Sequence, residues 1–170
     1  MTDDIIHYLQ AMQLPGLVVA IDFTKAFDTV SKKFILDSLK LYGFGPDFSR
    51  WYPCILLLQA DSCINHFGWI SEPFSIKWGI QQGCPSSGLI FVLAVKLLAI
   101  KIWSSSVNGI KISQTTPMNN LLEIILKIQQ FADNTTLYLK DKQDLNTVMD
   151  IFSSFAAVTE LKINSQETCG

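Results

Sequence analysis

Two aspartates at the ends of predicted strands are the residues of this chain best suited to chemistry. Asp133 lies in the segment Phe-Ala-Asp-Asn, between two strand-like runs, Leu122–Gln130 and Thr135–Leu139. Two such runs joined by a short polar link predict a β-hairpin with a carboxylate at its tip. A second apolar run, residues 17–21, is followed by Asp22. Because Mg²⁺ prefers carboxylate oxygens, the pair suggests a divalent-metal site if the fold brings the strand ends together.

The composition indicates a folded chain without a dominant positive field. The 170 residues fit one domain, and a hydrophobic content of 49% is enough to bury a core. Thirteen cationic and 15 acidic residues give a net charge of −2, so the overall charge does not indicate a nucleic-acid partner. Twelve of the cationic residues are lysines and Arg50 is the only arginine, which is few for a protein that clamps phosphates.

Cysteine spacing and hydropathy indicate a setting inside the cell. The four cysteines show no C-x-x-C spacing and only two histidines are present, which disfavours a zinc site or a disulfide framework. Residues 1–10 are acidic and amphipathic, unlike a signal peptide. The most apolar stretch, Leu89–Trp103, contains Lys96 and Lys101. We therefore expect a buried core helix there and no membrane partner.

The order of predicted elements indicates an α+β fold. Leaving out the middle of the chain, the order is strand, helix, hairpin, helix, strand, which is the ferredoxin-like βαββαβ plan. In that plan the first strand neighbours the hairpin, which places Asp22 near Asp133. The predicted helices are 3–13, a segment that Ser31 caps and Gly43 ends, 47–59, 89–104 and 143–158; the predicted strands are 17–22, 62–80 with a turn at Gly68, 110–113, the two hairpin runs and 161–163; the predicted loops are 81–88 and 114–120.

Three motifs occur in a recognisable order along the chain. Asp22–Asp28 (Asp-Phe-Thr-Lys-Ala-Phe-Asp) follows the first strand, Gln82–Ser87 (Gln-Gly-Cys-Pro-Ser-Ser) precedes the apolar helix, and residues 131–134 form the hairpin tip. Together they resemble the three palm motifs of reverse transcriptases, most closely those of non-LTR (LINE-type) retrotransposons. Ser71–Phe74 (Ser-Glu-Pro-Phe) and Leu161–Asn164 (Leu-Lys-Ile-Asn) extend the resemblance over almost the whole chain.

The resemblance implies a fold and a domain boundary. The fold would be a polymerase palm, in which helices cover one face of a ferredoxin-like or RRM-like antiparallel sheet. Residues 1–170 would form a single partial reverse transcriptase domain, the palm with part of the fingers, without a thumb or an endonuclease.

The resemblance also implies a chemistry. Members of the family are RNA-directed DNA polymerases that use two Mg²⁺ ions to add dNTPs to a DNA primer on an RNA template. Asp22 and Asp133 match the metal ligands of the family, and the backbone carbonyl of Phe23 matches a further ligand. The positions that match nucleotide or template contacts are Phe27, Gln82 and Gly83.

The chain departs from the family pattern at the hairpin tip. Where the family has two adjacent aspartates, this chain has Asp133 and Asn134. Asn134 offers a carbonyl oxygen but removes one negative charge from a site for two dications, for which we expect a rate loss of roughly 10²-fold or more. Glu167 stands where the family pattern places a lysine. Further departures are Trp78, Gln81, Ser86, Gly88 and Glu160. Together they predict a degenerate centre, inactive or strongly impaired.

Two other interpretations remain open from the sequence, and with them the question of whether the chain is an enzyme. The first is a non-catalytic, RRM-like nucleic-acid-binding module, which would expose aromatic residues on its sheet and a basic rim. The second is a translated relic of a retrotransposon without a selected function. Taken singly, Asp22 could be an ordinary strand-end acid and Phe27 a core residue. The sequence does not distinguish nucleus from cytoplasm.

Overall fold

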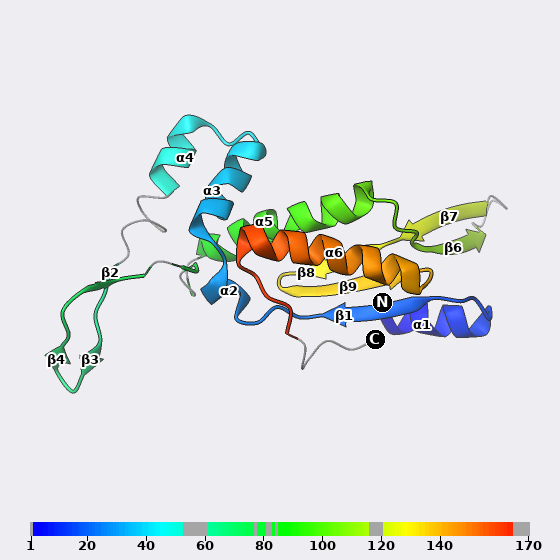
Figure 1. Cartoon of the computed structure of the whole chain (residues 1–170), viewed down its shortest axis with the longest axis horizontal. Helices are drawn as coiled ribbons and strands as arrows, with labels where there is room; N and C mark the ends of the chain where they lie inside the picture. Colours follow the sequence, from blue (N-terminus) through cyan, green and yellow to red (C-terminus); the bar gives the residue numbers. More distant parts are fainter. Residues whose placement is uncertain are drawn as a thin grey trace. The chain divides into compact units, whose positions relative to one another are not determined.

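The chain divides into two compact units. A computed structural model describes residues 2–52, 61–76, 78–80, 83, 85–115 and 121–164 (Figure 1). One unit, here called the sheet unit, comprises Met1–Phe23, Lys96–Phe155 and Ile163–Gly170. The other, here called the helical unit, comprises Thr24–Val95 and Ala156–Lys162.

A three-stranded antiparallel sheet forms the centre of the sheet unit. Its strand order is β1-β9-β8. The register pairs Leu17 with Leu139 at one end of β1 and Ile21 with Thr135 at the other. This order is that of strands 1, 3 and 2 of the ferredoxin-like plan, so the prediction that the first strand neighbours the hairpin is confirmed. The strands are β1 (Leu17–Ile21), β8 (Ile128–Phe131) and β9 (Asn134–Leu139).

The two faces of this sheet have different surroundings because side chains alternate along each strand. Val19 and Leu137 are paired and buried on one face. On the other face Tyr138 is fully buried and belongs to a cluster with Ile5 and Leu9 of helix α1 (Thr2–Ala11). Helix α1 thus covers the part of this face near the start of β1. The cluster does not extend to the part near the end of β1.

The run predicted as one strand over residues 122–130 is two strands, and that prediction is wrong. β7 (Leu121–Leu126) pairs with β6 (Ile110–Thr115), whereas β8 pairs with β9. The chain changes partner at Lys127, whose carbonyl oxygen accepts a hydrogen bond from the Tyr138 N–H at 2.9 Å. β6 also extends past the predicted 110–113, so the predicted loop 114–120 begins too early. Residues 116–120 lie outside the described residues.

Two long helices follow the predicted apolar patterns. α5 (Pro85–Ser104) begins four residues before the predicted 89, because proline at a first helical position has no hydrogen bond to lose. α6 (Lys142–Thr159) is close to the predicted 143–158, and the Asp141 side chain caps it by accepting the Asp144 N–H at 3.0 Å. Apolar residues recur along α6 at helical spacing: Val148, Ile151, Phe152 and Phe155 are buried and Leu145 is half-buried.

Helix α5 is longer than the predicted apolar stretch and meets the length and hydropathy expected of a membrane span. Its 20 residues, with a mean hydropathy of 1.8 over an 18-residue window, are long and apolar enough to cross a bilayer by length and composition alone. About 39% of that window is buried inside the protein. Phe91 and Leu98 are fully buried whereas Leu89 is 71% exposed. A partly buried core helix meets the same criterion, so this helix is weak support for a membrane span.

The helical unit contains short helices and short strand pairs. Ser31 occupies the N-cap position of α3 (Lys32–Leu41), where the sequence predicted the helix start, but its side chain makes no capping hydrogen bond. Gly43, at φ 78°, follows the predicted end of this helix. The predicted helix 47–59 begins at Pro46 and is described as far as Tyr52; residues 53–60 lie outside the described part. The elements are α2 (Ala26–Thr29), α3 (Lys32–Leu41), α4 (Pro46–Tyr52), β2 (Asp61–Ser62), β3 (Asn65–His66), β4 (Trp69–Ile70) and β5 (Phe74–Ser75).

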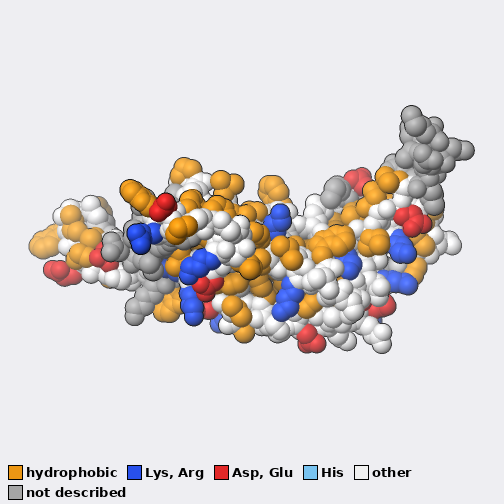
Figure 2. Space-filling view, turned by 90° about the horizontal axis from the view of Figure 1, so that it is seen from above, with side chains coloured by type: hydrophobic (Ala, Val, Ile, Leu, Met, Phe, Trp, Pro, Cys, Tyr) orange, Lys and Arg blue, Asp and Glu red, His pale blue; other side chains and the backbone are white. Residues whose placement is uncertain are grey.

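The strand-like segment 62–80 forms two short ladders. β2 pairs with β5, and β3 pairs with β4 across a turn made by Phe67 and Gly68. Gly68 has a φ of 90°, which confirms the predicted turn. Phe67 and Trp69 are 93% and 83% exposed, and Figure 2 shows hydrophobic side chains on the surface of this hairpin.

Candidate functional site

Asp22 and Asn134 both line a hollow at one end of the three-stranded sheet. Asp22 directly follows β1, and Asn134 is the first residue of β9. Since Ile21 pairs with Thr135, continuing the antiparallel register by one position places Asp22 opposite Asn134. Both lie at the end of the sheet face that α1 does not cover, next to a hollow of about 330 Å³. The residues lining it are Ala20, Ile21, Asp22, Asn134, Thr135 and Thr136.

Asn164 holds Asp22 from the other side of β1. Its backbone N–H donates to the Asp22 carbonyl oxygen at 2.9 Å, and its side-chain Nδ2 donates to Asp22 Oδ2 at 3.3 Å. Phe23 and Ile163 form an antiparallel bridge next to these bonds. The predicted strand 161–163 is therefore present only as a bridge, but it lies beside the end of β1, where the ferredoxin-like plan has its fourth strand.

Sequence reasoning missed the role of Asn164. It lay within a segment that resembled the family, but 142 residues separate it from Asp22. No local pattern reports a contact over that distance.

The side chain of Phe23 anchors the backbone that follows Asp22. It is 3% exposed and its ring lies 6.0 Å from that of Phe152, at an interplanar angle of 31°. The sequence suggested the Phe23 backbone carbonyl as a metal ligand. The hydrogen bond from the Asn164 N–H goes to the Asp22 carbonyl and not to that of Phe23.

Asp133 lies in the turn of the hairpin rather than on a strand. Phe131 pairs with Asn134, which leaves Ala132 and Asp133 as a two-residue turn. Ala132 has a φ of 53°, a left-handed conformation that costs a residue with a side chain roughly 1–2 kcal/mol. Asp133 is half-buried and is not among the residues that line the hollow. The structure thus brings Asp22 together with Asn134, and it places Asp133 one residue farther along the tip.

The predicted nucleotide-contacting residues belong to the helical unit or are not described. The half-buried ring of Phe27 stacks on Phe91 with 4.4 Å between centroids, and its carbonyl accepts the Ile80 N–H at 2.7 Å. Gly83 is exposed with a φ of 88°, and Gln82 lies outside the described residues. The roles of these three residues therefore remain predictions.

Gly79 is a structural residue near Phe27 that the sequence did not single out. Its φ is 79°, and a Cβ added there would lie 2.8 Å from the Phe27 carbonyl oxygen and 2.7 Å from that of Asp28. The backbone of Phe27 can therefore pack this closely only against a glycine.

The donor groups at the hollow suit a hard cation in part. Asp22 supplies a carboxylate, Asn134 an amide oxygen and Thr136 a hydroxyl, all of them oxygen donors of the kind that Mg²⁺ takes alongside water and phosphate. Within the described ranges, no group of three or more His, Cys, Asp or Glu side chains could hold a metal ion. Asp22 is the one carboxylate among the described residues that line the hollow, so an arrangement of two ions would also require Asp133.

The chain belongs to the reverse transcriptase family. A family model described as reverse transcriptase (RNA-dependent DNA polymerase) matches residues 1–169. A 149 kDa protein of transposon TX1 from Xenopus laevis is 23% identical over 168 residues, and a Pol polyprotein of the type-2 retrotransposable element R2DM from Drosophila melanogaster is 27% identical over 150. The predicted resemblance to non-LTR retrotransposon proteins is confirmed. These alignments cover 98% and 88% of this chain but 12% and 13% of the relatives.

Solved structures confirm the fold class. Telomerase from Candida albicans, in complex with a TWJ fragment of telomeric RNA, superposes with a TM-score of 0.68 at 10% identity. Telomerase from Candida tropicalis with the same kind of RNA fragment gives 0.66 at 14% identity. The matches cover 99% and 98% of this chain and 30% and 28% of those chains. The predicted α+β polymerase palm is therefore the fold of this chain.

Proposed function

We propose that this chain is the palm of a reverse transcriptase, with part of its fingers, whose polymerase centre has lost one metal-binding charge. The observation that carries the proposal is the position of Asn134, opposite Asp22 at the hollow. RNA-directed DNA synthesis by this chain is strongly impaired or absent. Its partners, in the ancestral activity, are an RNA template, a DNA primer and dNTPs, and its setting is intracellular.

The metal requirement follows from the family, whose members generally use divalent metals. Asp22 and Asp133 are the residues that would hold Mg²⁺, with Asn134 and the Phe23 carbonyl as neutral ligands. When bound, the two ions would activate the primer 3′-OH and stabilise the leaving pyrophosphate. Asn164 orients the Asp22 carboxylate through the 3.3 Å hydrogen bond.

Asn134 is the residue that weakens this centre. An amide oxygen can coordinate a cation but brings no negative charge, so repulsion between two dications is compensated less. From the usual cost of removing one electrostatic stabiliser, the rate falls by roughly 10²-fold or more.

The RRM-like binding module has less support from the sheet. Such a module stacks bases on aromatic residues of its exposed strands. The part of the face beyond α1 carries Ala20, Thr136 and Asn134, and the aromatic residue beside them is Phe131, which is 80% exposed. One edge aromatic with no adjoining aromatic on the described strands β1, β8 and β9 is a poor stacking platform.

Primer extension on an RNA template with Mg²⁺ tests the proposal. We expect the Asn134→Asp variant to extend the primer roughly 10²-fold faster than the wild-type chain, and adding Asp22→Ala to abolish the gain. Mn²⁺ binding, followed by electron paramagnetic resonance, gives a readout that does not depend on turnover. Robust wild-type extension that Asn134→Asp does not improve would overturn the proposal. So would an Asn134→Asp variant that gains neither activity nor Mn²⁺ affinity.

A further inference from the structure

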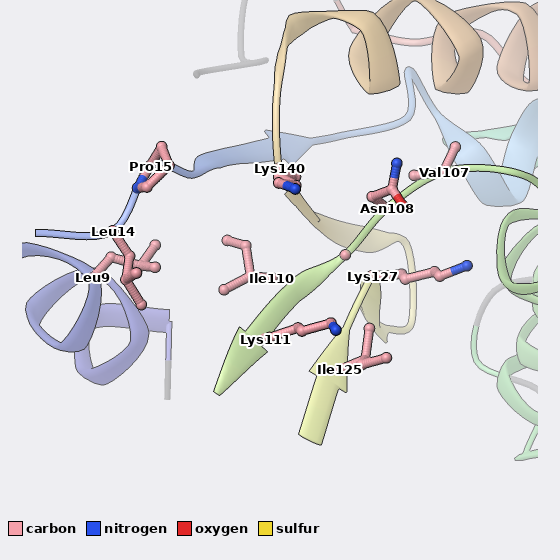
Figure 3. A pocket seen from close by; sticks show the side chains of 11 residues that line it. Leu9, Leu14, Pro15, Val107, Asn108, Ile110, Lys111, Ile125, Lys127 and Lys140 are labelled. Carbon is pink, nitrogen blue, oxygen red and sulfur yellow. The ribbon is translucent and has the colours of Figure 1, made fainter. Parts of the chain in front are cut away.

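A second hollow, of about 450 Å³, lies in the sheet unit at the opposite end of β1 from Asp22 (Figure 3). Pro15, just before β1, and Lys140, just after β9, both line it, whereas Asp22 follows the other end of β1. At about 3.3 Å per residue, the five residues of β1 separate the two hollows by roughly 17 Å.

The wall of this hollow combines apolar and cationic side chains. The apolar part comes from α1, the segment before β1, and the β6–β7 ladder, and includes Leu9, Leu14, Ile110 and Ile125. The charged part is three lysines from three segments: Lys111 on β6, Lys127 between β7 and β8, and Lys140 after β9 (Figure 3). No aspartate or glutamate is among the described residues that line it.

The three ammonium groups lack a carboxylate partner within the part of the chain that the structure describes. Lys127 Nζ donates to the Trp103 carbonyl oxygen at 3.3 Å and lies 5.6 Å from the centroid of the Trp103 ring, so its position is fixed without neutralising its charge. Three of the twelve lysines of a chain with net charge −2 thus lie around one hollow with no acid among its described lining residues. A negatively charged group next to any of these ammonium groups is favoured, because no carboxylate among the described residues neutralises them.

We propose that this lysine-lined hollow binds the phosphate backbone of a single-stranded nucleic acid. Lysine ammonium groups neutralise phosphates without reading sequence, and the apolar wall accommodates the face of a sugar or base. The span of roughly 17 Å to Asp22 equals about five steps at the 3.4 Å duplex spacing per strand and fewer steps of a more extended single strand, so one strand could reach both hollows. The inference rests on the assignment to the reverse transcriptase family but not on the state of the polymerase centre.

Binding of a labelled single-stranded RNA oligomer to the full chain, without Mg²⁺ and over a range of KCl concentrations, tests this inference. The test variant is Lys111→Gln, Lys127→Gln and Lys140→Gln together. We expect its affinity to fall at least tenfold. We also expect the slope of log K against log [salt] to decrease by about 2, at about 0.7 for each lost phosphate contact on a single strand.

A matched control removes the same charge elsewhere in the sheet unit. Lys96, Lys101 and Lys142 are exposed lysines on α5 and α6 and do not line the hollow. Their joint replacement by Gln should leave most of the affinity and of the salt slope. Equal losses in the two triple variants would show that net charge alone matters and would overturn the inference.

Two further measurements define what the lysine-lined hollow binds. Competition with inorganic phosphate or a free dNTP distinguishes a strand site from a small-anion site. If the Lys→Gln test variant loses dNTP binding and keeps oligomer binding, the proposal of a strand site is wrong. RNA binding by Asn134→Asp should show the same dependence on the three lysines, because this site does not require the polymerase centre. A circular dichroism melt confirms that each triple variant is folded.

Discussion

Two hairpins of this protein use similar turns and have opposite surroundings. The β8–β9 hairpin turns through Ala132 and Asp133, and the β3–β4 hairpin turns through Phe67 and Gly68; each has a positive φ at the first turn position. β9 is paired on both sides, by β1 and by β8, whereas β3 and β4 form a separate two-stranded ladder.

The difference shows that neighbouring elements, not the turn, fix a hairpin tip in space. In β9, four of the six residues are buried, while β3 and β4 are exposed throughout. The tip that carries Asp133 and Asn134 is therefore held by a central strand. An isolated two-stranded hairpin, in contrast, is only marginally stable by itself.

The largest expected effect breaks the packing of the central strand. Leu137 is fully buried and lies between Val19 of β1 and Ile128 of β8. We expect Leu137→Ala to lower the free energy of unfolding by about 2–5 kcal/mol. Trp69→Ala in β4 removes a side chain that is 83% exposed. This substitution should change the free energy of unfolding by less than about 0.5 kcal/mol. Urea unfolding measures both, and comparable losses would contradict the contrast between the hairpins.

A smaller effect concerns the segment that holds the end of β1 beside the hairpin. Asn164→Ala removes the amide that donates to Asp22 Oδ2 and should cost about 1 kcal/mol of unfolding free energy. Asn146 on α6 is exposed and gives a matched control, Asn146→Ala. Urea denaturation of both variants decides the matter: if the loss is no greater for Asn164→Ala than for the control, the contact does not stabilise the site.

The smallest effect should be shared by the two hairpins. Ala132→Gly and Phe67→Gly each remove a Cβ from a left-handed turn position. Relief of roughly 1–2 kcal/mol of strain is offset by the larger entropy loss of glycine, about 0.5–1 kcal/mol. A net gain of about 0.5 kcal/mol is expected in both variants, measured by thermal unfolding. A gain in only one of them would show that the turns themselves differ.

Local sequence patterns predicted which segments form helices and strands better than they predicted which strands pair with each other. The alternation over 135–139 and the helical spacing over 143–158 gave elements that the structure contains. The division of 122–130 at Lys127 was missed because no glycine, proline or other turn-forming residue interrupts the run. Only pairing with β6 on one side and β9 on the other separates them. The early start of α5 was missed because Pro85 has the same preference for a loop as for a first helical position.

The sequence by itself determined the family, the order of the three motifs, and the replacement of a second aspartate by Asn134. The tertiary structure decided which tip residue faces Asp22 and which distant residue holds it. A two-residue turn and the β1–β9 register place Asn134, not Asp133, opposite Asp22. Because side chains alternate along a strand, a shift of one residue would reverse that choice. The contact from Asn164 to Asp22 spans 142 residues, and only the folded chain brings them together.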